Sequence, residues 1–254
     1  MPIQIKNSER LAFIGSTGSG KTQLAKFFLS QLNRVGVIDP KHMFRLDGFK
    51  TSFNFPTWSR EFKLIVRPKV NDDEKLYEYI RKLYKLRNVT IYVDEMATLS
   101  DMFPYTTGAL ADIARIGREP RVALWSAMQR PRGTPRIFLS ESETFFVFNL
   151  RAREDREYIK GYAGDEVTER IQKYHFWHIR TDAESPELLT LDLENNRIMT
   201  ANLNERSQDV NWKNRADPAF CRLCVDDRYR RKNGGESGQS LHSQSESISR
   251  GLSG

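Results

Sequence analysis

The sequence FIGSTGSGKTQLAKFF, from Phe13 to Phe28, contains the most informative motif of the chain. Between Gly15 and Thr22 it fits the spacing G-x-x-x-x-G-K-[ST], in which a glycine-rich loop turns its backbone N–H groups toward nucleotide phosphates. A short apolar run precedes the loop, and apolar residues recur at helical spacing after it. A strand, a phosphate loop and a helix therefore follow one another, which is the context that this motif requires.

The loop residues predict a nucleotide site in which each side chain has its own task. The ammonium group of Lys21 would reach the β- and γ-phosphates, and the hydroxyl group of Thr22 would bind Mg²⁺. The helix that begins near Lys21 directs its positive end toward the same phosphates. We therefore expect ATP and Mg²⁺ as cofactors. The residues expected to surround the nucleotide are Gly15, Ser16, Thr17, Gly18, Ser19, Gly20, Lys21 and Thr22.

A second chemical signal is the sequence VTIYVDE, residues 89–95, in which a strand of β-branched and aromatic residues ends on two carboxylates. By itself, such a sequence is typical of a strand followed by a solvated acidic turn. Downstream of a phosphate loop it predicts more. Asp94 would hold Mg²⁺, directly or through water, and Glu95 would polarise the water that attacks the γ-phosphate. An acid beside the Mg²⁺ ligand favours hydrolysis over phosphoryl transfer to a small acceptor.

Strands and helices alternate along the chain, which predicts a mostly parallel sheet flanked by helices on both faces. We therefore predict an α/β fold of the P-loop NTPase class. A further strand between the phosphate-loop helix and VTIYVDE fits the additional-strand, RecA-like type of this fold. The expected strands are residues 10–15, 35–41, 62–68, 89–95, 121–129 and 144–150, with two late strands at a sheet edge, 174–180 and 187–193; the expected helices are residues 21–32, 72–86, 108–117, 153–164 and 165–174.

Composition shifts toward the end of the chain. We predict a P-loop ATPase domain at residues 1–200, a basic C-terminal extension at residues 201–232 and a tail at residues 233–254. The extension ends on RYRRK, which is either a DNA contact or a solubilising run. Ser and Gly dominate the tail, so it cannot bury enough apolar area to offset its ordering entropy, and we expect it to be disordered.

The chain of 254 residues carries a net charge of +7 and has a pI near 9.4. This balance favours a polyanionic partner, although an ordinary solubilising surface carries a similar excess. No apolar run approaches the ~20 residues of a membrane span, so we expect no membrane insertion. The two cysteines provide no disulfide framework, which favours a cytoplasmic location.

Those cysteines, Cys221 and Cys224, form one C-x-x-C pair. A structural zinc site usually needs four ligands, and the sequence has no second pair. Two incidental thiols are therefore the favoured interpretation, and metal binding stays open as the alternative.

The sequence QRPRGTPR begins at Gln129, at the end of an apolar strand. Because strand carboxyl ends gather at the ligand crevice of a doubly wound sheet, Gln129 is a candidate sensor of the γ-phosphate; an ordinary loop residue is the alternative. We expect its arginines, Arg130, Arg132 and Arg136, to bind DNA phosphates. A solvated basic loop is the competing interpretation.

Four segments together resemble the FtsK/HerA superfamily of DNA-translocating ATPases: VIDPK after the second expected strand, YVDE, GREPRVALWSAMQRP and ETFFVFNLRAREDREYI. That superfamily typically shows an aspartate-glutamate strand end, a glycine-arginine turn and a strand that ends in Gln-Arg-Pro. The likeness runs from about Leu11 to about Tyr162, and QRP is its most specific element. Without the N-terminal barrel, membrane helices and winged-helix module of cellular members, the chain is similar to compact viral genome-packaging ATPases.

Members of that superfamily work as rings in which an arginine of one subunit completes the site of its neighbour. The resemblance therefore implies a homo-oligomeric ring. Arg115 and Arg118, at the end of the helix ARIGRE, are expected to act in this way by stabilising the charge on the transferring phosphate. Arg151 and Arg153 are the alternatives, and the sequence leaves the choice open.

The motifs and the resemblance together imply an ATPase that drives double-stranded DNA through a ring. A viral genome-packaging motor, located in the host cytoplasm and partnered by a portal or capsid protein, is the leading hypothesis. A cellular or conjugative DNA pump is the second. An assembly switch that binds ATP and moves nothing is the alternative from another class.

Overall fold

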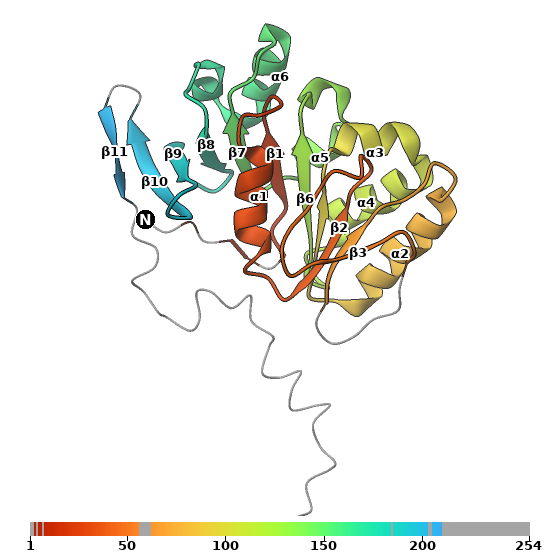
Figure 1. Ribbon diagram of the computed structural model, residues 1–254. Helices are drawn as coiled ribbons and strands as arrows, with labels where there is room; N and C mark the ends of the chain where they lie inside the picture. Colours follow the sequence, from red (N-terminus) through yellow and green to blue (C-terminus); the bar gives the residue numbers. More distant parts are fainter. Residues whose placement is uncertain are drawn as a thin grey trace, which may run out of the picture. The chain divides into compact units, whose positions relative to one another are not determined.

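Strands from most of the chain pair into one sheet, which Figure 1 shows with helices packed against it. The computed structural model describes residues 3, 5–6, 8–55, 62–183, 185–202 and 205–209. Within them, the strand order across the sheet is β11-β10-β9-β8-β7-β1-β6-β5-β2-β4-β3. The bounds are β1 Leu11–Ile14, β2 Arg34–Ile38, β3 Lys50–Ser52, β4 Phe62–Val66, β5 Val89–Val93, β6 Val122–Met128, β7 Thr144–Phe148, β8 His175–Arg180, β9 Glu187–Asp192, β10 Arg197–Asn202 and β11 Glu205–Asp209.

The strands from β7 to β3 are paired in parallel, and β8 to β11 extend the β7 edge as antiparallel strands. Every residue of β1, β5 and β6 is buried, as expected for strands covered on both faces. β6 lies between β1 and β5, so the two motif strands are separated by one additional strand. The predicted α/β P-loop NTPase fold, with late strands at an edge, is therefore confirmed.

The described helices divide between the two faces of the sheet. Apolar residues of α1 pack with Phe13, Trp125 and Phe146 on one face. Those of α2, α3, α4, α5 and α6 belong to a second cluster on the other face. The bounds are α1 Lys21–Leu29, α2 Asp73–Leu86, α3 Met96–Met102, α4 Pro104–Ile116, α5 Ile137–Ser140 and α6 Arg153–Ala163, with 3₁₀ turns η1 Pro131–Gly133 and η2 Asp165–Thr168.

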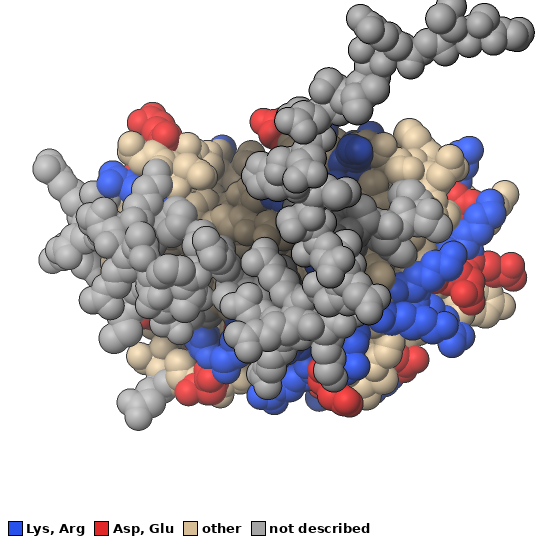
Figure 2. Space-filling model, turned by 90° about the horizontal axis from the view of Figure 1, so that it is seen from below, with Lys and Arg blue, Asp and Glu red and all other residues tan. Residues whose placement is uncertain are grey.

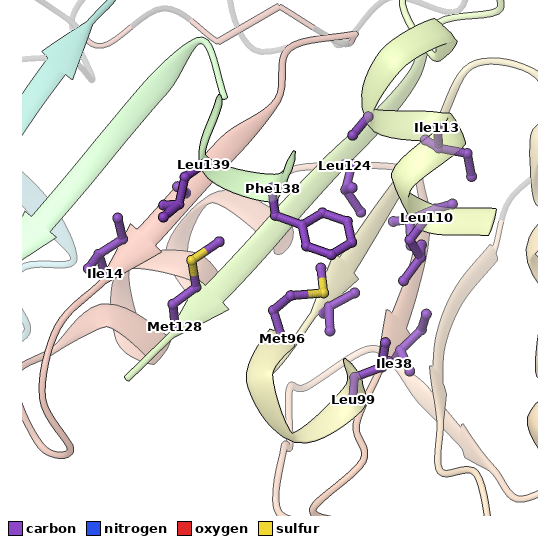
Figure 3. Packing of buried hydrophobic residues seen from close by; sticks show 14 of the residues in the cluster. Ile14, Ile38, Met96, Leu99, Leu110, Ile113, Leu124, Met128, Phe138 and Leu139 are labelled. Carbon is purple, nitrogen blue, oxygen red and sulfur yellow. The ribbon is translucent and has the colours of Figure 1, made fainter. Parts of the chain in front are cut away.

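The packing beneath the site is dense on both faces. On the α1 face, the ring of Phe13 stacks on that of Phe146 with centroids 5.0 Å apart, and Phe28 of α1 lies 5.5 Å from Phe146. On the other face, Phe138 of α5 lies above the sheet near Met96, as Figure 3 shows. Buried aromatic and aliphatic side chains of this size supply most of the driving force for folding. They fix the ends of β1, β5 and β6, which carry the site.

Some local predictions were wrong. Residues 165–174 do not continue as a helix, because Gly164, at φ 90°, ends α6 and only the short turn η2 follows. α3, α5, β3, β10 and β11 were not predicted, and α4 begins at Pro104 rather than near residue 108. Pro104 explains the earlier start, because proline is favoured in the first turn of a helix.

The predicted boundaries after residue 200 concern a part of the chain of which little is described. The sheet itself continues through β10 and β11 to Asp209. Cys221, Cys224, RYRRK and the Ser/Gly-rich tail lie outside the described residues. None of the described helices combines the length and the apolar composition that crossing a membrane requires.

Candidate active site

The phosphate loop joins the carboxyl end of β1 to the first turn of α1 and has the backbone geometry that its glycines permit. Gly18 and Gly20 have φ values of 77° and 119°, in the region that L side chains rarely adopt. A Cβ atom at Gly15 would lie 2.6 Å from Cβ of Phe148, closer than two non-bonded carbon atoms can approach. The residues between β1 and α1 therefore form a loop that is strictly dependent on glycine.

Neighbouring strands hold this loop in place through its backbone. The N–H of Gly15 donates to the carbonyl of Met128 at 3.1 Å, and the N–H of Ser16 donates to that of Asn149 at 3.1 Å. The N–H of Tyr174, just before β8, donates to the carbonyl of Ser19 at 3.0 Å. The loop is thus tied to segments that end β6, follow β7 and precede β8, which preorganises it for a ligand.

Lys21 opens α1, and its side chain is buried. Burial lowers the pKa of Lys21, while the nearby carboxylates of Glu95 and Asp94 oppose that shift. The charges of both acids of VTIYVDE therefore act on the ammonium group. Adding phosphate oxygens would further favour its charged form, as the predicted role requires.

Asp94 follows the last residue of β5, beside the end of β2. Its N–H donates to the carbonyl of Ile38 at 3.0 Å, and its Oδ1 accepts a hydrogen bond from the Tyr92 hydroxyl at 2.9 Å. Burial raises the pKa of Asp94, and the hydrogen bond from Tyr92 acts against this. A cation at this carboxylate would favour its ionised form.

The residues predicted to hold Mg²⁺ fit that ion by their chemistry. Thr22 offers a hydroxyl oxygen and Asp94 a carboxylate oxygen, which are the hard donors that Mg²⁺ prefers. Among the described residues, no group of three or more His, Cys, Asp or Glu side chains is placed to hold a metal. Two protein ligands suffice for Mg²⁺ in nucleotide sites, since phosphate oxygens and water complete its shell.

Glu95 is the most constrained residue of the site. It is buried and has φ 90° and ψ 82°, values that are unusual for a residue other than glycine. Its Oε1 accepts a hydrogen bond from the N–H of Gln129 at 3.2 Å, and its Oε2 lies 3.5 Å from Nζ of Lys41. Backbone strain of this kind persists only where the surroundings enforce it, and it clusters at functional sites.

Gln129 links the phosphate loop to the carboxylate. Its side-chain Oε1 accepts a hydrogen bond from Oγ1 of Thr17 at 3.0 Å, while its backbone N–H binds Glu95. A change in the phosphate loop can therefore reach Glu95 through one residue at the end of β6. This position suits the predicted role of Gln129 as a sensor of the γ-phosphate, and that role stays a prediction.

The arginines predicted to act in trans lie in two places. Val122, at the start of β6, donates to the carbonyl of Gly117, so Arg115 and Arg118 lie at the edge of the sheet opposite the phosphate loop. Arg151 lies at the same edge as the loop, because its N–H donates to Oγ of Ser16 at 3.0 Å. The alternatives Arg151 and Arg153 are therefore nearer the nucleotide site within one subunit, and every trans role stays a prediction.

The basic turn after Gln129 is exposed at the carboxyl edge of the sheet. Arg130, Arg132 and Arg136 all have exposed side chains around η1. The opposite edge, seen from below in Figure 2, shows Lys and Arg side chains beside Asp and Glu side chains, so its visible part carries mixed charge. The three arginines lie on the same edge as the phosphate loop, as predicted from their place in the sequence.

Sequence reasoning gave no role to Lys41, which the structure places beside Glu95. Its one signal was its position after a buried strand, in the segment VIDPK. Strand pairing, which no local pattern reveals, brings it to the site.

Comparison with known proteins finds a relative by sequence and several by fold. No family model matches the chain. The DNA packaging ATPase P9 of Enterobacteria phage PRD1 is 26% identical over 181 residues, which cover 68% of this chain and 78% of that protein.

Two solved structures share the fold. The genome packaging NTPase B204 of Sulfolobus turreted icosahedral virus 2, in complex with AMPPCP, has a TM-score of 0.59 at 16% identity, covering 72% of this chain and 97% of that one. The cytoplasmic domain of the type VII secretion ATPase EccC of Thermomonospora curvata has a TM-score of 0.52 at 16% identity, covering 72% of this chain and 25% of that one. The fold is that of P-loop NTPases. The resemblance to the FtsK/HerA superfamily, and to compact viral DNA-packaging ATPases within it, is confirmed.

Proposed function

We propose that this chain is an ATP-hydrolysing motor that moves double-stranded DNA into a viral capsid. The observation that carries the proposal is the placement of Glu95, a buried carboxylate whose charge acts on Lys21 and which is joined to the phosphate loop through Gln129. The phage relative and the viral structures are named as packaging ATPases or NTPases, which supports both the hydrolysis and the biological setting.

Each residue of the site has a task in hydrolysis. The phosphate-loop backbone and Lys21 bind and orient the phosphates, and Thr22 and Asp94 would hold Mg²⁺. When bound, Mg²⁺ supplies positive charge against the phosphate oxygens. Glu95 accepts a hydrogen bond from the attacking water and takes its proton as the water oxygen bonds to the γ-phosphorus and the bond from that phosphorus to the leaving ADP oxygen breaks. Gln129 contacts both the phosphate loop and Glu95, so a change in the loop on nucleotide binding can shift Glu95 and the basic turn that follows.

DNA is the proposed substrate of the basic turn. Arg130 precedes η1, Arg132 lies in it and Arg136 follows it, so a shift of Gln129 can reach a DNA phosphate within a few residues. Contacts of this kind neutralise phosphates without reading sequence, as a motor that travels along any DNA requires.

Replacing Arg130, Arg132 and Arg136 together by Gln should weaken binding to every DNA sequence alike. Each neutralised phosphate releases close to one counterion. Losing three contacts should therefore make the plot of log affinity against log salt less steep, with a slope smaller in magnitude by about three. Fluorescence anisotropy with labelled duplexes at several salt concentrations measures both effects. The matched control replaces three exposed basic residues of α2, Arg81, Lys82 and Lys85, by Gln. Equal slopes in the parent and the turn variant would show that the turn is only a solvated loop.

A homo-oligomeric ring with an arginine acting in trans is the proposed assembly. Mixing Glu95→Gln subunits with subunits that lack the acting arginine should restore part of the hydrolysis, because some interfaces then pair an intact arginine with an intact Glu95. We expect this rescue for Arg118→Ala or Arg115→Ala, and the same mixtures with the alternatives Arg151→Ala and Arg153→Ala rank all four. Rescue in none of the mixtures would show that none of these four arginines acts in trans.

The alternatives differ from a packaging motor in measurable ways. ATP hydrolysis strongly stimulated by long double-stranded DNA supports a motor, whereas slow turnover with or without DNA indicates an assembly switch. A cellular or conjugative pump would share that stimulation but would not bind a portal or capsid protein. We place the motor in the host cytoplasm, where empty capsids and replicated DNA meet.

A further inference from the structure

A lysine outside every nucleotide motif contacts the proposed base. Nζ of Lys41 lies 3.5 Å from Oε2 of Glu95. The lysine side chain is 35% exposed and the glutamate side chain 7% exposed, so solvent reaches the pair from the lysine end only. An ion pair that is partly removed from water constrains its partners more than one on the open surface.

The pairing of β2 with β5 brings Lys41 to this position. The two strands are parallel and in register, with Ile38 opposite Val93. The N–H of Asp94 continues the ladder by donating to the carbonyl of Ile38 at 3.0 Å. Residues that follow Ile38 therefore emerge at the same edge as Glu95.

The turn that carries Lys41 is anchored by a buried aspartate. The carboxylate of Asp39 accepts hydrogen bonds from the N–H groups of Met43 and Phe44 at 3.1 and 2.9 Å. It also pairs with Nε of Arg67 at 3.0 Å, and its own N–H donates to the carbonyl of Val66 at 2.9 Å. Lys41 thus projects from a turn that is fixed on both sides of its attachment point.

Glu95 needs a partner of this kind. Its backbone is held at φ 90°, and within the described part of the chain its carboxylate accepts one backbone N–H, that of Gln129, on Oε1. The nearby ammonium of Lys21 has to serve the phosphates when nucleotide binds. Lys41 is then the cation that stays with Oε2.

We propose that Lys41 is a positioning residue, which holds the carboxylate of Glu95 in the orientation that polarises the attacking water. The proposal rests on the proposed function of the site as an ATPase. Lys41 itself need not touch the nucleotide, so its loss should slow the chemical step and leave binding of ATP almost unchanged.

Steady-state hydrolysis of Lys41→Met, Lys41→Arg and the exposed-lysine control Lys50→Met tests this. Because a misplaced catalytic group slows reaction steeply, Lys41→Met should lower kcat by at least about tenfold. KM and the affinity for a fluorescent non-hydrolysable ATP analogue should stay within about twofold of the parent values, because Lys41 does not contribute to binding of ATP before the chemical step. Lys41→Arg should recover most of the turnover, and Lys50→Met should match the parent.

A double variant shows whether Lys41 acts through Glu95. Lys41→Met added to Glu95→Gln should cause no further loss, because the carboxylate that it positions is already gone. A parent-like kcat in Lys41→Met, a parallel loss of analogue binding, or a further multiplicative loss in the double variant would overturn the proposal. Absence of hydrolysis in the parent would instead overturn the proposed function, and with it this inference.

Discussion

Glu95→Gln is expected to lower the turnover number for ATP hydrolysis about 100- to 10,000-fold, the range that general-base catalysis typically contributes. The amide oxygen can still accept the hydrogen bond that Gln129 N–H now gives to Oε1, at 3.2 Å, but the group can no longer take a proton from water. Binding of ATP should persist, since Glu95 has no part in holding the phosphates. Phosphate release and analogue binding, measured on the same preparation, separate the two effects.

The exposed acid Glu194, in the hairpin between β9 and β10, provides the matched control. Glu194→Gln makes the same change of charge far along the chain from every motif and should leave turnover at the parent value. Equal turnover in Glu95→Gln and the parent would remove Glu95 from catalysis. The water would then have to be activated elsewhere, and the strained backbone at Glu95 would lose its functional explanation.

Lys21→Ala should fail differently, by losing the nucleotide itself. A hydrogen bond to a charged group is worth about 1.5–3 kcal/mol, so losing contacts to two phosphates should weaken ATP binding by roughly a hundredfold or more. ATP at 100 times its dissociation constant stabilises a protein by about 2.7 kcal/mol, so the parent should show a clear thermal shift that Lys21→Ala lacks.

The contrast with an exposed lysine keeps this prediction specific. Lys50→Ala, in the edge strand β3, removes the same charge at a position without contact to the phosphate loop and should retain the full ATP-induced shift. Lys21→Ala with parent-like affinity would contradict the assignment of residues 15–22 as the phosphate loop. A variant that fails to melt cooperatively even without ATP would be replaced by Lys21→Met, which keeps more of the buried volume.

The sequence was sufficient for those parts of the site whose chemistry is local. The phosphate loop, its strand and its helix are contiguous, so their spacing already encodes the geometry that the φ values of Gly18 and Gly20 display. VTIYVDE likewise predicts a buried strand with two acids at its end, which the structure has. The other parallel strands were predictable because they are mainly apolar, as burial on both faces demands, whereas the short edge strand β3 is polar and gave no such signal.

Other parts depend on which strands become neighbours, and no local pattern states that. The contact of Lys41 with Glu95 arises from the register of β2 with β5, and that of Thr17 with Gln129 from the insertion of β6 beside β1. Residues 165–174 were misassigned because polar helix-forming residues outweighed the glycine that precedes them. The distance of Arg115 from the phosphate loop likewise follows from the direction in which α4 runs.

Movement along double-stranded DNA is the activity that defines a packaging motor, and displacement of a third strand measures it. A labelled oligonucleotide is bound as a triplex near one end of a long duplex, and its release is followed after the protein and ATP are added. The proposed movement predicts release that requires ATP and free duplex leading to the triplex, and that stops in Glu95→Gln. ATP hydrolysis without any release, on duplexes that the protein demonstrably binds, would contradict it.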